Sequence, residues 1–336
     1  MSERCLVVGA GGISGAWFPP LKEEGVEVAA VVDLRLDAAQ EKIARFELSA
    51  EASADLDAML AKHCPDFLLD LTVPEAHCRV TTAALRAGIP VIGEKPMAST
   101  LDEAREMVRV SEETGVMYMV SQSRRWDKNH DAARRTLASG AVGDLTTIHC
   151  DFFIGAHFGG FRDEMPSPLI LDMAIHQFDL ARFMAGVDPV SVYAVEFNPK
   201  GSWYRGDASA VCLFEMTGGV IFTFRGSWCS EGCMTSWNGH WRFIGTRGTL
   251  LCERDETPQG EVVAGGEGFF RPLQPVAVVP SPMEKLAYHG GLLEMLAFLR
   301  TGTKPQTECH DNIKSWAMVT AAMESSRRGE RVPVEW

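Results

Sequence analysis

A repeated alternation of apolar runs and helix-forming segments constrains the fold of residues 1–120 more than any other feature of the sequence. The apolar runs lie at residues 5–9, 26–32, 67–73, 90–93 and 116–120, and helical segments lie near residues 38–46, 56–62, 74–87 and 99–115. Such alternation is typical of a parallel sheet with helices on both faces. Because ligands bind at the carboxyl edge of these sheets, the residues after each strand are the first candidates for a site.

The first apolar run ends in a glycine-rich turn, GAGGISG at residues 9–15, which leads into a helix-forming segment. Strand, glycine turn and helix in this order suit a dinucleotide pyrophosphate, because glycines allow close backbone approach and helix N–H groups face the anion. A serine stands at the third position of the fingerprint. The expected cofactor contacts in this turn are Gly9, Gly11, Gly12, Ile13 and Ser14.

Asp33 follows the second apolar run, eighteen residues after Gly15. A carboxylate at this position binds the adenosine ribose hydroxyls in dinucleotide-binding folds. Its negative charge repels a 2′-phosphate and therefore favours NAD over NADP, while Arg35 keeps NADP open as the alternative. The structural alternative for Asp33 is a cap at the end of a strand.

Two further strand ends carry polar or cationic residues. Thr72 and Pro74 follow the third run, with His77 close behind, and Glu94-Lys95-Pro96 follows the fourth. A residue before proline is held in an extended backbone, whereas a purely solvated lysine more often lies on a helix flank. Lys95 is therefore either a cation of the site or a residue of a surface loop.

Residues 168–182, PLILDMAIHQFDLAR, predict a helix that is apolar except on one face. Asp172, His176 and Asp179 are spaced i, i+4 and i+7, which stacks them on that face. Burying such groups costs several kcal/mol unless they are paired. No lysine or arginine precedes Arg182 in this segment, so their partners come from elsewhere in the fold. The alternative to a catalytic site is a structural histidine–aspartate pair.

From residue 145 the pattern changes to strands joined by glycine-rich turns, at residues 145–154, 190–197, 208–216, 220–228 and 241–245, with the 168–182 helix inserted after the first. This predicts a mainly antiparallel sheet in a second domain, residues 121–336. The strand at 208–216 has two apolar faces, so helices cover one and a second subunit covers the other. A homodimer or homotetramer is therefore expected. Residues 255–282 have no clear period and stay unassigned.

Composition limits the class of protein. The 336 residues suffice for two domains, and a net charge of −13 without a dense basic cluster argues against a nucleic-acid or membrane-surface partner. No apolar run approaches the roughly 18 residues of a membrane span, and the early first strand leaves no room for a signal peptide. The nine cysteines show no paired spacing, which predicts reduced thiols, a cytoplasmic location and no zinc site.

The order of these motifs resembles the Gfo/Idh/MocA oxidoreductases, the family of glucose–fructose oxidoreductase and inositol dehydrogenase. The resemblance rests on the glycine turn, Asp33, the Pro74/His77 turn, Glu94-Lys95-Pro96 and the Asp172/His176/Asp179 helix. It implies an α/β chain with an N-terminal doubly wound Rossmann domain, residues 1–120, and a C-terminal α+β domain with a large open sheet. It also implies a nicotinamide cofactor in the first domain and a substrate cleft between the domains.

The resemblance further implies catalytic roles for Lys95, Asp172 and His176, with His77 near the cofactor. Where the family often has a glycine-rich run and a glycine after its aspartate, this chain has Pro166-Ser167-Pro168 and Met173. The expected pocket walls are Arg125, Trp126, His157 and Arg162, with Trp203, Tyr204 and Arg205.

The expected function is an NAD(P)-dependent dehydrogenase or reductase that acts on a secondary alcohol of a sugar, an inositol or a related polyol. His176 suits the general base because its unperturbed pKa of about 6.5 lies near working pH. Lys95 would stabilise the charge on the same oxygen, and Asp172 would orient the substrate or His176. Two alternatives are an NAD-dependent glycosidase, which oxidises its sugar transiently, and a non-catalytic dinucleotide-sensing protein.

Overall fold

The computed structural model describes residues 2–336, which form two compact units. The first unit runs to Ser123 and includes Lys285–Ile313, and the second comprises Arg124–Glu284 and Lys314–Trp336. The predicted division at residue 120 did not include this return of the chain to the first unit. Helical periodicity in that segment predicts a helix but carries no information about which sheet the helix packs on.

The first unit is built on a six-stranded parallel sheet of order β3-β2-β1-β4-β5-β6. Its strands are β1 (Arg4–Val8), β2 (Glu27–Val32), β3 (Glu51–Ser53), β4 (Phe67–Asp70), β5 (Val91–Gly93) and β6 (Tyr118–Val120). Its helices are α1 (Ser14–Glu23), α2 (Leu36–Arg45), α3 (Leu56–His63), α4 (Pro74–Arg86), α5 (Leu101–Thr114) and α9 (Ala287–Thr301). The predicted β–α alternation is confirmed, and the short strand β3 was missed.

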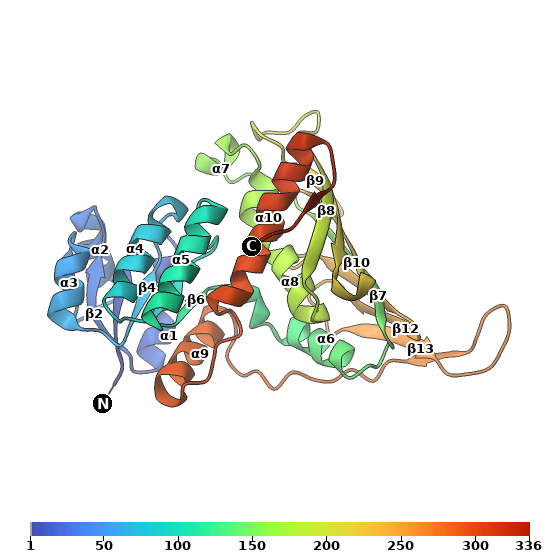
Figure 1. Ribbon diagram of the computed structural model, residues 1–336, viewed down its shortest axis with the longest axis horizontal. Coiled ribbons are helices and arrows are strands. Elements are labelled where there is room, and N and C mark those ends of the chain that lie inside the picture. Colours follow the sequence, from blue (N-terminus) through green and yellow to red (C-terminus); the bar gives the residue numbers. More distant parts are fainter. Residues whose placement is uncertain (1) are drawn as a thin grey trace. The chain divides into compact units, whose positions relative to one another are not determined.

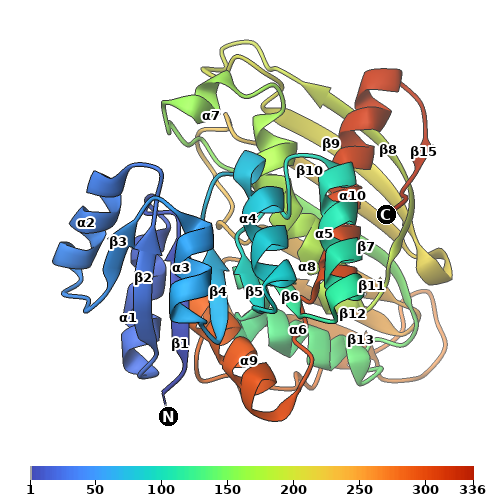
Figure 2. The same cartoon turned by 60° about the vertical axis from the view of Figure 1, so that its left-hand side comes forward.

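Helices α3, α4 and α5 stand side by side on one face of this sheet (Figures 1 and 2), while α1 contacts α9. The strands are buried on both faces, which explains their continuous apolar runs: the apolar residues of β4 and β5, for example, are completely buried. Helix α5 begins with a capping box between Thr100 and Glu103.

The second unit is organised by a nine-stranded sheet of order β14-β13-β12-β11-β7-β10-β9-β8-β15. Its strands are β7 (Leu145–Phe153), β8 (Pro189–Phe197), β9 (Ser209–Met216), β10 (Ile221–Ser227), β11 (His240–Gly245), β12 (Gly248–Cys252), β13 (Gln259–Val263), β14 (Leu273–Pro275) and β15 (Val332–Pro333). β7 and β10 pair in parallel and the other neighbours are antiparallel. The sheet is thus mainly antiparallel, as predicted, and β13 and β14 lie in the 255–282 segment, for which the sequence predicts no element.

Helices cover one face of this sheet, where α6 (Lys128–Ala138), α8 (Ile175–Ala185) and the second-unit part of α10 (Cys309–Arg328) lie (Figure 1). Phe178 of α8 packs its ring edge-on against Phe214, Phe222 and Phe224 of β9 and β10. These phenylalanine side chains are fully buried, so this contact fixes the 168–182 segment on the sheet.

The opposite face of the sheet is solvent-exposed near β8 and β9. Along β9, Cys212 and Phe214 are completely buried, whereas Val211 and Leu213 are 47% and 43% exposed. The two apolar faces predicted for this strand are therefore confirmed. Within residues 2–336, no helix is long and apolar enough to span a bilayer.

Candidate active site

The glycine turn of the first unit lies between β1 and the N-terminus of α1. Gly9 has a φ of +100°, and a Cβ there would lie 2.5 Å from the carbonyl oxygen of Leu71, so glycine is required. Gly11 and Gly12 are exposed, and a Cβ at either position would meet no atom within 4 Å. Ser14 is buried and donates its hydroxyl to the carbonyl of Gly11 over 2.8 Å, which closes the turn. The exposed backbone in front of α1 fits a bound pyrophosphate.

Asp33 holds the glycine turn against the end of β2. Its Oδ2 accepts from the backbone N–H of Ala10 at 2.7 Å, and its Oδ1 accepts from that of Arg35 at 2.8 Å. An ionised carboxylate has about four lone-pair sites, so about two remain for ribose hydroxyls. The side chain therefore has both a structural role and the capacity for the expected cofactor contact.

A hydrogen-bond network follows β4. Asp70 is completely buried, and its two carboxylate oxygens accept from the hydroxyls of Thr72 and Thr81 at 2.6 and 2.9 Å. His77 places Nδ1 2.9 Å from the carbonyl of Pro96 and Nε2 3.1 Å from that of Thr72. The buried His77 ring thus ties the turn after β4 to the turn after β5, which carries Lys95.

Glu94 and Lys95 stand at the carboxyl end of β5. Glu94 is buried and accepts from the indole Nε1 of Trp17 and from the backbone N–H of Lys95, both at 3.2 Å. Burial raises the pKa of the Glu94 carboxyl despite these donors. Lys95 is half-buried and is joined to Pro96 by a cis peptide bond. Lys95 thus follows β5 directly, at the carboxyl end of a strand of the parallel sheet.

In the second unit the predicted helix at 168–182 has two parts, a π-helix (Leu169–Ala174) followed by α8. The predicted single helix is thus divided into two elements, and Asp172 lies in the π-helical part while His176 and Asp179 lie in α8. Asp172 points to Arg162, whose Nε donates to its Oδ2 at 2.6 Å. π-Helical turns are frequent at functional sites because they reorient one side chain within a helix.

His176 and Asp179 lie on α8 and are both buried, with 8% and 1% exposure. Asp179 accepts two hydrogen bonds from Arg125, at 2.7 and 2.6 Å, and a third from Ser315 at 2.7 Å. The side chain of Arg125 is only 4% exposed. Asp179 thus belongs to a buried ion pair.

Two of the expected pocket-wall residues, Arg125 and Trp126, are buried residues of the second unit. Arg125 holds Asp179, and Trp126 is 3% exposed. Their expected contact with the substrate stays a prediction. The sequence alone does not show that Arg125 is buried. Two arginines before a tryptophan are equally compatible with a surface turn, and the partner of Arg125, Asp179, lies 54 positions away.

The loop at 156–166, which contains the short helix α7 (Phe161–Glu164), lies beside Asp172. His157 stacks on Trp203 with ring centroids 3.7 Å apart, and Trp203 and Tyr204 donate to the carbonyl of Ala156 at 3.0 and 2.5 Å. Arg205 donates its backbone N–H to the carbonyl of Asp163 at 2.7 Å. Of the remaining wall residues, His157 and Arg162 thus lie on this loop, and the 203–205 segment supports it.

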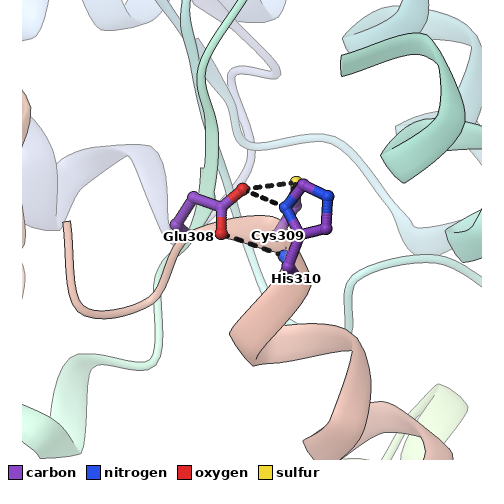
Figure 3. Close-up of side chains that lie close together, drawn as sticks. All are labelled: Glu308, Cys309 and His310. Atoms are coloured by element: carbon purple, nitrogen blue, oxygen red, sulfur yellow. Dashed lines mark hydrogen bonds and ion pairs between the residues drawn. The ribbon is translucent and has the colours of Figure 1, made fainter. Parts of the chain in front are cut away.

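A third cluster, Glu308, Cys309 and His310, has metal-ligand atoms within 4.8 Å of one another, the one such group among residues 2–336 (Figure 3). Glu308 accepts from Lys304 at 2.8 Å, from the thiol of Cys309 at 3.1 Å and from Nδ1 of His310 at 2.5 Å. Burial raises the pKa of the Cys309 thiol, which disfavours the thiolate that a metal needs. The Glu308 carboxylate also accepts from the backbone N–H of His310 at 3.2 Å, in the first turn of α10.

Sequence reasoning missed three residues that support the site. Trp17 and Asp70 bond to residues at the sheet edge, and Ser315 bonds to Asp179. Asp70 is the last residue of β4 and could have been found from that position. Trp17 and Ser315 lie 77 and 136 positions from their partners, and no local signal identifies them.

Comparisons with known proteins agree with this architecture. Residues 3–122 match the model of an oxidoreductase family with an NAD-binding Rossmann fold, and residues 130–251 match the Gfo/Idh/MocA C-terminal domain. The first unit is therefore an NAD-binding Rossmann domain, and the chain is an NAD(P)-dependent oxidoreductase.

Named relatives and a solved structure extend the likeness over nearly the whole chain. D-apiose dehydrogenase of Paraburkholderia graminis is 28% identical over 93% of this chain and 84% of its own length. 1,5-Anhydro-D-fructose reductase of Ensifer adhaerens is 26% identical over 99% of each chain. An oxidoreductase from Agrobacterium radiobacter, solved with NAD+, L-tartaric acid and magnesium, superposes with a TM-score of 0.87 at 22% identity over 99% of each chain. With both of its domains matched by models of the same family, the chain belongs to the Gfo/Idh/MocA oxidoreductases.

Proposed function

We propose that this protein transfers a hydride between NAD and a secondary alcohol of a sugar, an inositol or a related polyol. The observation that carries the proposal is the placement of Asp172 and His176 in an otherwise apolar helical segment of the second unit, beside a loop rich in polar and aromatic residues. The names of the relatives, D-apiose dehydrogenase and inositol 2-dehydrogenase among them, support the substrate class.

The proposed cofactor contacts come from the edge of the first sheet. Gly9, Gly11, Gly12, Ile13 and Ser14 would hold the pyrophosphate, and Asp33 would bind the ribose, with Arg35 beside it. Thr72, Pro74, His77, Glu94 and Lys95 would line the nicotinamide end. When bound, the nicotinamide ring supplies the hydride acceptor or donor.

The proposed catalytic residues are Lys95, Asp172 and His176. His176 would take the hydroxyl proton, because an imidazole titrates near neutral pH. Lys95 would donate to the same oxygen and stabilise its developing charge. Asp172, held by Arg162, would orient the substrate, and His157 would contact substrate hydroxyls from the same loop.

The test is a panel of aldoses, inositols and glycosides incubated with NAD and followed by NADH absorbance. Reduction of NAD with at least one free sugar or polyol supports the proposal. Cleavage of a glycoside without net NADH would identify the glycosidase alternative. Tight NAD binding with no turnover of any class would identify the sensing alternative.

We also propose that the exposed face of the nine-stranded sheet packs against a second copy in a homodimer or homotetramer. Support comes from Val211 and Leu213, which together with neighbouring apolar side chains of β8 remain exposed on that face. A reducing, cytoplasmic location is proposed as well, since all nine cysteines are free thiols.

A further inference from the structure

Two adjacent phenylalanines at the tip of a hairpin are the most exposed large apolar side chains among the described residues. This hairpin, the arm, comprises β13, β14 and the turn at 264–272. Phe269 and Phe270 are 96% and 85% exposed and pack edge-on against each other, with centroids 4.7 Å apart. Burial of each ring would contribute about 1.5–3 kcal/mol, so an aromatic pair at the end of an arm indicates a docking element rather than a scattered surface residue.

The arm projects from the side of the nine-stranded sheet opposite its helices (Figure 1). An open groove of about 760 Å³ lies at its base. The groove includes the apolar side chains of Leu251, Val263 and Leu273. Charged side chains of Arg242, Glu261 and Arg271 also line the groove, so β11 and β12 form one of its walls and the arm forms the other.

The same outer face carries an apolar patch on β8 and β9, called the β8–β9 patch. Its members are Tyr193, Val195, Phe197, Val211 and Leu213, each between 43% and 47% exposed. Tyr193 lies directly opposite Leu213 and Val195 directly opposite Val211. These cross-strand pairs make one continuous surface.

The arm and the β8–β9 patch lie toward opposite ends of the strand order, since β14 is the first strand and β8 the last but one. Consider two copies whose outer sheet faces meet. A two-fold axis that runs between them, parallel to the strands, places the arm of each copy over the β8–β9 patch of the other. An axis perpendicular to the strands would instead bring the two projecting arms together. They would then meet tip to tip and hold the two patches apart.

We infer that Phe269 and Phe270 of one copy dock on the β8–β9 patch of a second copy. The same two residues of the second copy dock on the patch of the first, so both arms stabilise the dimer. The inference deepens, and rests on, the proposed assembly through this sheet face. Because the contact is isologous, it closes at two copies and occurs twice.

The test uses an arm variant, Phe269→Ser/Phe270→Ser, and a patch variant, Val211→Ser/Leu213→Ser, in the full chain. All four side chains are exposed, so both variants should keep the wild-type melting temperature. Sedimentation equilibrium should give each variant a dimer Kd at least about tenfold weaker than wild type. Leu34→Ser, which changes an 83% exposed side chain of the first unit, should leave the Kd unchanged.

Mixing the two variants distinguishes the arrangements. A mixed dimer keeps one complete arm–patch contact, whereas each variant's own dimer keeps none, so the mixed dimer should be the tighter one. A mixture with no such preference, or an arm variant with the wild-type Kd, would overturn the docking while leaving the assembly itself standing. A monomeric wild-type protein would overturn both, and arm-dependent sedimentation of that monomer with phosphatidylglycerol vesicles would assign the tip to a membrane surface instead.

Discussion

Arg162 and Asp172 form an ion pair, with Nε of Arg162 2.6 Å from Oδ2 of Asp172, and this pair joins the 156–166 loop to the π-helix that carries the proposed catalytic aspartate. The side chains are 33% and 15% exposed, so the pair is partly desolvated. Arg162 also lies over the rings of Phe158 and Phe161. The guanidinium is therefore fixed on both sides and sets the orientation of the Asp172 carboxylate.

Arg162→Ala should lower kcat/KM by roughly 10- to 100-fold, because the Asp172 carboxylate loses its ion pair with Arg162. Stability should change by only about 1 kcal/mol, as for other partly exposed pairs. Arg162→Lys should recover part of the activity, since lysine keeps the charge but not the planar fork. Arg327→Ala, which breaks an exposed pair with Glu324 on α10, is the matched control. Unchanged kinetics for Arg162→Ala would show that catalysis does not depend on the orientation of Asp172 by Arg162.

Cofactor preference should follow Asp33. NAD should bind at least about tenfold, or ~1.4 kcal/mol, better than NADP, because the carboxylate repels a 2′-phosphate. Asp33→Ala should narrow this ratio, while Asp37→Ala, in the first turn of α2, should not. Calorimetric titration of both cofactors measures the ratio. Equal or tighter binding of NADP to the wild-type protein would contradict the assignment and make Arg35 the deciding residue.

The buried pair of Arg125 and Asp179 should be a stability element. Asp179→Ala removes the carboxylate that accepts two hydrogen bonds from the buried guanidinium and should lower the free energy of unfolding by about 3–5 kcal/mol. Arg125→Met combined with Asp179→Leu should recover much of that loss, because an apolar pair of similar volume has no charge to desolvate. Denaturant unfolding of the three proteins checks this. A loss below about 1 kcal/mol for Asp179→Ala would show that the pair is not structural.

His310 should make stability depend on pH. Hydrogen bonds to Glu112 and Glu308 raise the pKa of His310 above its ordinary 6.5, against the effect of burial. Because the pKa of His310 is higher in the folded than in the unfolded protein, protonation of His310 stabilises the fold. This contribution is fully present below about pH 6.5, and it is lost as the pH rises through the pKa of the folded state. The melting temperature should therefore fall more steeply above about pH 6.5 in the wild-type protein than in His310→Gln. Parallel curves for the two proteins would show that these ion pairs contribute nothing.

Local sequence signals were sufficient for most of the fold. The glycine turn and the alternating burial of Val211 and Cys212 each follow from residues close together in the chain, and each was predicted. The return of residues 285–313 to the first unit was not found, because amphipathic periodicity identifies a helix without identifying its partner sheet.

The site shows the same division between local and long-range information. The need of Asp172 and Asp179 for cations was predictable from their apolar surroundings. The sequence did not predict that these cations are Arg162 and Arg125. Arg125, for example, had been expected on a pocket wall. The π-helix also escaped prediction, because the spacing of Asp172 and His176 fits a regular α-helix equally well.

Turnover of His176→Ala, Lys95→Ala and the double variant, measured with the melting temperature on the same samples, tests the central proposal most directly. Each single change should lower turnover by roughly 10²–10⁴-fold, and His176→Ala should leave NAD affinity little changed. The double variant should lose much less than the product of the two, because both residues act on one oxygen. A well-folded His176→Ala protein that keeps more than about a tenth of wild-type turnover on its true substrate would contradict the assignment of His176 as general base.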